Sequence, residues 1–281
     1  MTKALTIIWE AVFQIASNFR PRRPAGLSAS MQMTWVFGLS IAIPISAASS
    51  TAVQAQHRPS PAETCLAANP NISIGIRLPR TGTRLTSGAR LKVVAIGSSS
   101  TVGLWVLNSA ATYPAVMRQE LIRLRPDAQI EVINSGRIGD TIPGSIARIE
   151  RDVLSHRPDL IIWQLGTNDI AWGGQAGGLD ELMTRGIRTL KSQGSDVILM
   201  DQQYARQVLS SSAHSQMQAM IANVARKENI GLFSRFELMR NAVGAGLSTS
   251  ALVSWDGLHN SKDGYDCIGR AMARAIWAAA H

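Results

Sequence analysis

A run of small hydroxyl side chains follows a strongly apolar segment near residue 97. The run reads IGSSST and extends from Ile96 to Thr101, with Gly97 as its glycine. A serine that enters a helix directly after such a glycine lies beside unpaired backbone N–H groups, which suits a nucleophile and stabilises a developing oxyanion. One serine of this run is therefore a candidate nucleophile. Serine and threonine are also favoured helix caps, and this motif taken alone favours capping.

Two more polar turns follow apolar runs further along the chain. NSGRIGDT (134–141) contains Gly139, whose N–H can approach a ligand closely because glycine has no side chain. GTND (166–169) contains Asn168, a neutral side-chain donor of the kind that oxyanion holes use. Each motif by itself is more typical of an ordinary turn, since Gly, Asn and Asp are the commonest turn residues.

The sequence WDGLHNSKDGY places Asp256 two residues before Leu258 and three before His259. A carboxylate one helical turn from an imidazole can accept the proton of one ring nitrogen, which leaves the other nitrogen free as a base. Such a pair is the orienting half of a catalytic triad. Alone it would be interpreted as an exposed Asp and a solvated His. The remaining histidines lack this setting and are interpreted as surface or structural residues: His57, His156, His214 and His281.

Apolar runs that lack polar alternation precede these motifs and predict the elements that position them. Such runs are typical of strands buried on both faces of a parallel sheet. The expected strands are 91–97, 128–136, 159–166, 196–200 and, more weakly, 230–234. Helical spacing predicts crossover helices over 113–124, 145–156, 179–194 and 214–229 and a last helix over 261–280. The result is a doubly wound α/β fold, which collects functional groups at the carboxyl ends of its strands.

Taken together, the four motifs resemble the blocks of the SGNH (GDSL-like) serine hydrolase family in order, type and placement over about residues 91–281. The resemblance implies that family's flavodoxin-like three-layer α/β/α sandwich, with a parallel sheet of roughly five strands. It further implies a catalytic triad of Ser99, Asp256 and His259. The oxyanion hole would be built from the N–H of Ser99 together with Gly139 and Asn168.

This chain departs from the family pattern at Ser98, where the family usually has aspartate. That aspartate supports the turn and does not attack substrate, so a hydroxyl can replace its hydrogen bonds. The departure puts the fine positioning of the turn in doubt, while the nucleophile stays assigned. Ser100 is the alternative nucleophile if the alignment shifts by one residue.

The resemblance implies hydrolysis of carboxylic esters through an acyl-enzyme, without a cofactor. Because family members include esterases, lysophospholipases, thioesterases and carbohydrate acetylesterases, the expected partner is a small-molecule or glycan ester. Trp172 and Trp255 lie in expected flexible loops, 170–178 and 241–255, and are candidate walls for an acyl chain or a sugar ring. Core packing explains both tryptophans equally well.

Two hypotheses of other classes stay open. A non-catalytic envelope protein would use the same fold to bind glycan, although an intact Ser99, Asp256 and His259 argue against it. A flavodoxin-like nucleotide-binding protein would need a phosphate-binding loop after the first strand. GSSSTVG resembles such a loop only loosely and has no lysine.

The first 55 residues predict a secretory signal. An arginine cluster, FRPRRP, precedes an uncharged stretch over 31–55 that has an apolar centre and ends in small residues. An uncleaved membrane anchor is the alternative, but the strongly apolar part is short for a span. We therefore expect a periplasmic or secreted protein with no stable membrane span after processing. Residues 56–90, rich in Pro, Thr, Asn and Gly, are expected to form an irregular extension of a hydrolase domain over 91–281.

Cysteine content and charge narrow the class of protein further. In an exported protein, Cys65 and Cys267 suggest one disulfide from the mature N-terminus to the last helix, whereas in a cytosolic protein they would be buried thiols. No metal site is expected, because these cysteines lie far apart without a local histidine partner. Of the formal net charge of +9, +3 lies in the first 55 residues, which leaves +6 for the rest. The later basic residues are scattered, so we expect no binding of nucleic acid.

Overall fold

A computed structural model of the chain describes residues 58–281, apart from the side chain of Trp172. Its centre is a parallel sheet of five strands in the order β2-β1-β3-β4-β5. The strands are β1 (Leu91–Gly97), β2 (Ile130–Gly136), β3 (Leu160–Gln164), β4 (Asp196–Met200) and β5 (Gly231–Phe233). Each apolar run that was expected to form a strand contains one. The targeting segment expected over residues 1–55 lies outside the described residues.

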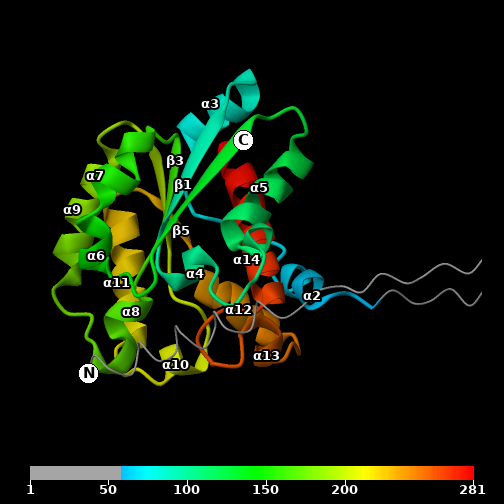
Figure 1. Ribbon diagram of the computed structural model, residues 1–281, viewed down its shortest axis with the longest axis vertical. Helices are drawn as coiled ribbons and strands as arrows, with labels where there is room; N and C mark the ends of the chain where they lie inside the picture. The colour runs from blue at the N-terminus through cyan, green and yellow to red at the C-terminus, as the bar shows by residue number, and fades with distance from the viewer. Residues whose placement is uncertain (1–57) are drawn as a thin grey trace, which may run out of the picture. The chain divides into compact units, whose positions relative to one another are not determined.

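Helices cover both faces of the sheet (Figure 1). On one face, α14 (Lys262–Ala280) packs against α5 (Tyr113–Leu124) and α2 (Pro61–Ala67). On the other face, α9 (Leu179–Lys191) packs against α6 (Ile142–Ile146), α7 (Ile149–Asp152) and α11 (His214–Lys227). This three-layer α/β/α arrangement confirms the predicted fold.

The core lies along the two central strands. All five side chains of β3 are buried, and β1 is buried except for the half-buried Lys92. Because both faces of these strands meet helices, their sequences contain long apolar runs instead of alternating polar residues. Edge strand β2 is covered less completely, and several of its side chains are half-buried.

The helix predicted over 145–156 is interrupted. The chain instead forms α6, α7 and a 3-10 turn, η2 (Leu154–His156). The break falls at Arg148, whose φ of −125° and ψ of 3° are not helical. The side chain of Arg148 is buried against Asp140. The ion pair that this arrangement forms contributes to the candidate site described below.

Residues 56–90 differ from the expected irregular segment, because they contain α2 and α3 (Pro79–Ser87). Ser60 begins α2 with a capping box: its hydroxyl accepts from the amide of Glu63, and the Glu63 carboxylate accepts from the amide of Ser60. Between the two helices, the carbonyl of Ile74 accepts a hydrogen bond of 3.0 Å from the amide of Leu232 in β5. The segment therefore runs along the outer edge of β5.

A disulfide joins Cys65 of α2 to Cys267 of α14, with their Cα atoms 6.1 Å apart. Both sulfurs are buried among the helices of that face. The predicted pairing is confirmed. Within residues 58–281, no helix is long and apolar enough to cross a membrane.

Short helices form the edge of the molecule at the carboxyl ends of the strands. They are α4 (Ser99–Val102), α8 (Thr167–Ile170), η3 (Ala171–Gly173), α10 (Arg206–Leu209), α12 (Arg235–Gly244) and α13 (Thr249–Leu252). The segment 241–255, expected to be a flexible loop, contains the end of α12 and all of α13. It is therefore more regular than its Gly, Ser and Ala content predicted.

Candidate active site

Ser99 begins α4 directly after the end of β1. A tight turn at Gly97 makes this possible, because a Cβ on Gly97 would lie 2.5 Å from Oγ1 of Thr101 and 2.8 Å from the side chain of Gln164. No residue other than glycine fits there without displacing these neighbours. As the first residue of a helix, Ser99 has a backbone N–H without a partner inside the helix, as the sequence motif predicted.

Ser98 faces into the molecule and holds the turn. Its amide and its hydroxyl both donate to Oε1 of Gln164, at 2.8 Å and 2.9 Å, and Thr101 Oγ1 donates to the same oxygen at 3.2 Å. Gln164, at the end of β3, therefore fixes the turn that carries Ser99. The hydroxyl of Ser98 takes part in this support, as expected for a residue in the place of the family's aspartate.

Three side chains form a continuous hydrogen-bonded series. The hydroxyl of Ser99 lies 2.8 Å from Nε2 of His259, and Nδ1 of His259 lies 2.5 Å from Oδ2 of Asp256. The carboxylate can only accept, so Nδ1 carries the proton and Nε2 is free to accept from the serine. Oδ1 of Asp256 accepts from the amides of Leu258 and His259, both at 3.0 Å. Sequence positions 160 residues apart thus meet as the motifs predicted.

The carboxyl of Asp256 stays ionised to low pH. Burial raises its pKa, but the hydrogen bonds from His259, from the Leu258 amide and from the Trp105 indole outweigh burial and lower the pKa to about 2. An ionised Asp256 keeps the imidazole in one tautomer and stabilises the imidazolium that forms when the serine loses its proton.

Trp105 is a site residue that the sequence did not reveal. Its indole Nε1 donates to Oδ2 of Asp256 at 2.8 Å, the oxygen that also faces His259. Its backbone has a φ of 71°, a left-handed conformation that is uncommon for a bulky residue. The indole meets the imidazole of His259 edge-on, with centroids 6.5 Å apart, and lies 5.2 Å from the ring of Trp255.

Gly139 and Asn168 are held beside the nucleophile turn. The amide of Arg137 donates to the carbonyl of Gly97 at 2.8 Å, which joins the Gly139 loop to the turn before Ser99. Asn168, in α8, donates from Nδ2 to the carbonyl of Asp140 at 2.8 Å. Gly139 has a φ of +76°, a conformation suited to glycine, and a Cβ there would meet no atom within 4 Å. The two candidate oxyanion residues therefore flank one loop that is hydrogen-bonded to the turn of the candidate nucleophile.

A buried ion pair fixes this loop. The guanidinium of Arg148 donates to Asp140 Oδ2 from Nη2 at 2.5 Å and from Nε at 3.0 Å, and the hydroxyl of Ser145 donates to the same oxygen. The guanidinium also donates to the carbonyl of Gly97 at 3.2 Å. Arg148 thus connects the residue after Gly139 to the turn before Ser99.

A second buried network supports the loop that carries His259. Gln203 donates from Nε2 to the carbonyl of Leu258 at 2.9 Å, and its Oε1 accepts from Thr167 at 3.0 Å and from Arg235 at 2.8 Å. Arg235 is fully buried and also donates to the carbonyl of Asp201. Burial lowers the pKa of Arg235 to about 10 and raises that of Asp201 to about 6. These buried polar groups connect α8, α12 and the His259 loop.

The other predicted site residues lie as follows. Ser100, the alternative nucleophile, is 1% exposed, and the histidine contacts Ser99 and not Ser100. Trp255 is 80% exposed beside Trp105, so it lies at the edge of the site and not in the core. The side chain of Trp172 lies outside the described part of the structure.

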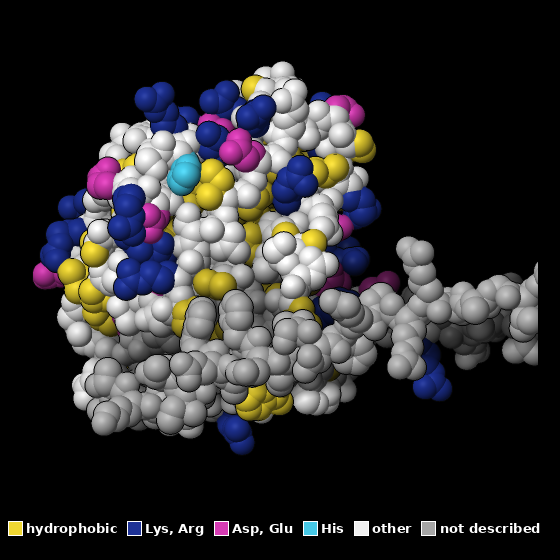
Figure 2. All heavy atoms as spheres, viewed as in Figure 1, with side chains coloured by type: hydrophobic (Ala, Val, Ile, Leu, Met, Phe, Trp, Pro, Cys, Tyr) yellow, Lys and Arg dark blue, Asp and Glu magenta, His cyan; other side chains and the backbone are white. Residues whose placement is uncertain are grey.

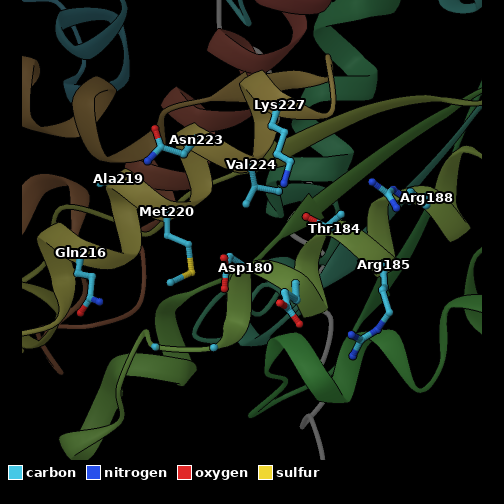
Figure 3. A pocket seen from close by; sticks show the side chains of 13 residues that line it. Asp180, Thr184, Arg185, Arg188, Gln216, Ala219, Met220, Asn223, Val224 and Lys227 are labelled. Atoms are coloured by element: carbon cyan, nitrogen blue, oxygen red, sulfur yellow. The ribbon is translucent and has the colours of Figure 1, made fainter.

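One hollow lies beside the loop that carries Asp256, and a second lies on the side of the molecule formed by α9 and α11. One, of about 750 Å³, is lined by Tyr204, Leu209, Val253, Trp255 and Gly257 among others and adjoins the Asp256 loop. The other, of about 710 Å³, is a groove lined by Asp180, Arg185 and Arg188 of α9 and by Met220, Asn223 and Lys227 of α11 (Figure 3). This groove is not lined by Ser99, Asp256 or His259.

Comparison with known proteins gives a family and several relatives. A model of the Non-GDSL lipase-like family matches residues 64–281, and so begins inside the segment expected to precede the hydrolase domain. The chain is similar to an arylesterase of Vibrio mimicus, with 27% identity over 114 residues that make up 41% of this chain and 56% of that protein. The chain thus matches little more than half the length of this relative.

Solved esterase structures share the fold. A two-domain esterase active on acetylated mannans has a TM-score of 0.65 at 22% identity, over 75% of this chain and 56% of that chain. An acetylxylan esterase from Geobacillus stearothermophilus has a TM-score of 0.58 at 24% identity, over 66% and 94%. A lipase/acylhydrolase from Enterococcus faecalis has a TM-score of 0.57 at 22% identity, over 67% and 96%. Together with the family match, they confirm the resemblance to GDSL-like hydrolases.

Proposed function

Because the chain belongs to the Non-GDSL lipase-like family, we propose that it is a serine esterase that hydrolyses carboxylic esters through an acyl-enzyme. The observation that carries this proposal is the continuous series of hydrogen bonds from the hydroxyl of Ser99 through His259 to Asp256. An alcohol, an imidazole and a carboxylate in this order are the groups that acyl transfer requires.

In the first step, Nε2 of His259 accepts the proton of Ser99 while Oγ attacks the ester carbonyl. The carbonyl carbon becomes tetrahedral and its oxygen takes the negative charge. Asp256, kept ionised by its hydrogen bonds, stabilises the imidazolium. The imidazolium then gives its proton to the leaving alcohol, and the acyl group remains on Ser99.

The oxyanion would be stabilised by the N–H of Ser99, the N–H of Gly139 and the free N–H of the Asn168 amide. One N–H of this amide is already committed to the carbonyl of Asp140, which leaves the second to face the developing charge. Donors fixed in place before the reaction stabilise the transition state without reorganising.

In the second step, His259 removes a proton from water, which attacks the acyl-enzyme and releases the acid. The same imidazole then returns the proton to Ser99 Oγ. Water and the side chains of Ser99, His259 and Asp256 supply the groups that this cycle requires, so the reaction is proposed to run without a cofactor.

A small-molecule ester or an esterified glycan is the proposed substrate class. Two of the structural relatives are described as active on acetylated mannans or as an acetylxylan esterase. Trp105 joins the ring of His259 to that of Trp255, which is 80% exposed. An exposed ring beside the histidine supports a substrate in which the ester is carried on a larger molecule.

Export to the periplasm or the exterior is also proposed. The disulfide between Cys65 and Cys267 supports it, since disulfides persist mainly in oxidising compartments. N-terminal sequencing of protein recovered from the host's envelope and medium tests this point. A mature chain that starts close to Ala55 is expected, and recovery of the complete chain in the cytoplasm would contradict it.

Turnover of p-nitrophenyl esters of increasing chain length, and of acetylated xylan, tests the esterase proposal. We expect the wild type to be active and Ser99→Ala to lose nearly all activity. Asn168→Ala is expected to lose roughly 10²–10³ in kcat. Ser100→Ala is the matched control and is expected to keep the activity if it folds, as checked by circular dichroism.

Labelling by a fluorophosphonate probe identifies the nucleophile independently of the substrate. Wild type is expected to be labelled at Ser99 and Ser99→Ala to stay unlabelled. Equal turnover by Ser99→Ala and wild type would overturn the assignment. A folded wild type that is neither labelled nor active would favour the non-catalytic glycan-binding alternative.

A further inference from the structure

The exposed hydrophobic side chains of this protein are concentrated at one edge. In the described part of the chain, the large hydrophobic residues that remain exposed are Trp105, Leu107, Ile138, Leu209 and Trp255, which we call the apolar rim. Leu107 is fully exposed and Trp255 is 80% exposed. Each of the five follows the carboxyl end of a strand or lies in the loop before α14. The apolar rim therefore lies at the same edge of the fold as Ser99.

A soluble surface usually scatters its exposed hydrophobic residues and does not gather them around one site. The helices on the flanks follow the usual pattern. Many of the Lys and Arg side chains that Figure 2 shows lie over helices of the flanks such as α3 and α9. The concentration at one edge thus indicates a surface that meets a partner.

Two exposed positive charges lie in the loops that carry the apolar rim. Arg137 precedes Ile138 and Arg206 opens α10; both side chains are exposed, and neither takes part in an ion pair or side-chain hydrogen bond within residues 58–281. The acidic residues of the same loops are engaged instead by protein donors and are buried or half-buried: Asp140, Asp169, Asp201 and Asp256. A partner of negative charge is therefore complementary to this edge.

The rim residues are held in place by the protein. Trp105 is fixed by its hydrogen bond to Asp256 and by contact with the ring of Trp255. The helix α10, which carries Arg206 and Leu209, is tied to the Asp256 loop, because Gln207 donates to the carbonyls of Asp256 and Gly257 at 3.0 Å and 3.2 Å. A fixed surface loses little conformational entropy when it binds.

The types of side chain favour a lipid layer over a folded protein or a glycan. Tryptophan prefers the boundary between apolar and aqueous phases, and two are present here in contact. Leu107 and Ile138 are aliphatic and project from separate loops. Sugar rings stack on aromatic faces and gain little from isolated aliphatic tips, whereas such tips insert readily into a fluid acyl layer.

From the apolar rim and its flanking guanidinium groups we infer that this edge docks on an anionic lipid surface. The aliphatic tips would enter the outer acyl region, while Arg137 and Arg206 would lie at the level of the lipid phosphates. Docking in this orientation turns the opening of the candidate site toward the membrane. The inference does not depend on Ser99 acting as a nucleophile.

Co-flotation with lipid vesicles tests the inference on the full chain. We expect binding to mixed phosphatidylcholine–phosphatidylglycerol vesicles and much weaker binding to pure phosphatidylcholine. Leu107→Asp is expected to weaken partitioning at least about tenfold. Arg206→Gln is expected to weaken it about fivefold on the anionic vesicles. Arg185→Gln, which removes another exposed and unpaired guanidinium from the α9–α11 groove, is the matched control and is expected to bind as wild type does.

The N-terminal 57 residues are common to all variants, so a difference in vesicle binding between variants does not come from them. Hydrogen exchange then identifies which amides of the chain the vesicles protect. Vesicles are expected to protect the amides of 103–108 and 136–139 but not those of α9. The Ser99→Ala variant is expected to bind vesicles as wild type does, whatever its activity. Vesicle binding that Leu107→Asp leaves unchanged, or protection absent from both loops, would overturn the inference. The inference would also be overturned if the protein bound acetylated xylan and did not bind the vesicles.

Discussion

The indole nitrogen of Trp105 lies 2.8 Å from Oδ2 of Asp256 and donates to it. The same oxygen accepts from Nδ1 of His259, so two ring N–H groups share one carboxylate oxygen. Trp105 follows the candidate nucleophile by six residues, and its indole therefore connects the loop after Ser99 to the loop that carries His259. We regard it as a positioning residue, because it acts on the carboxylate and not on the reacting atoms.

Replacing Trp105 by phenylalanine keeps a ring but removes this donor. We expect kcat on a short p-nitrophenyl ester to fall about tenfold with little change in KM, since a hydrogen bond to a charged group contributes about 1.5–3 kcal/mol. Trp255→Phe is the matched control, because the bond to Asp256 comes from Trp105. Equal kcat values for the two variants would show that the hydrogen bond from Trp105 to Asp256 does not contribute to turnover.

The lowered pKa of Asp256 predicts a pH dependence of stability. Its pKa falls from the ordinary 3.8 to about 2, because hydrogen bonds outweigh burial. A carboxyl with a lowered pKa in the folded state stabilises the fold above its unfolded pKa, and this contribution is lost as the pH falls through the folded pKa. The melting temperature of wild type should exceed that of Asp256→Asn most near neutral pH. The difference should shrink between pH values of about 4 and 2, and thermal unfolding followed by circular dichroism measures it.

A difference in melting temperature that stayed constant down to the most acidic buffer would show that the charge of Asp256 does not stabilise the fold. The comparison is between wild type and Asp256→Asn. The other carboxyl groups titrate in both proteins, so their contributions to the difference in melting temperature cancel.

The ion pair between Arg148 and Asp140 is buried on both sides, with side chains 4% and 1% exposed. Removing one partner leaves the other charge buried and unpaired, which costs about 3–5 kcal/mol. Arg148→Met should therefore lower the free energy of unfolding by about that amount in urea denaturation, and should lower kcat as well, because the Gly139 loop loses its support.

Arg151→Met is the control for this loss. Arg151 pairs with Asp152 but its side chain is 75% exposed, so we expect no resolvable change in the free energy of unfolding. The double variant Arg148→Met/Asp140→Asn should recover part of the lost stability. A stability of Arg148→Met equal to that of Arg151→Met would contradict the structural role of the buried pair.

The disulfide between Cys65 and Cys267 closes a loop over a sequence separation of 202 residues. In the chain-entropy model, a loop of this length contributes on the order of 5 kcal/mol at most. Cys65→Ser/Cys267→Ser should unfold at lower denaturant concentration than wild type under oxidising conditions. In the presence of a reductant, wild type and the double variant should unfold at the same denaturant concentration. A wild type whose unfolding does not change when the reductant is added would contradict the prediction.

The parts of the site that form from contiguous motifs could be predicted from the sequence. The apolar runs 91–97 and 196–200 coincide with β1 and β4, because strands buried on both faces need uninterrupted apolar residues. Ser99, Asp256 and His259 follow from short motifs placed at strand ends, and their side chains meet as expected.

The supporting residues could not be predicted, because they act through contacts between distant parts of the chain. Trp105 gave no local signal, since its role depends on Asp256 lying 151 positions later. Gln164 offered one usable signal, a polar side chain at the end of the otherwise apolar strand LIIWQ. The helix expected over 145–156 breaks at Arg148, where the side chain pairs with Asp140 in the interior, a contact between separate loops that helical spacing does not reveal.

The hydrogen bond from Leu232 to Ile74 has a consequence for self-association. A sheet that ends in an uncovered strand offers free amides and carbonyls to a strand of another molecule, and so promotes aggregation. The segment before α3 occupies that position along β5 and blocks the addition of further strands at this side. A shortened chain that begins after residue 77 would lose this protection and should form larger assemblies at the β5 side.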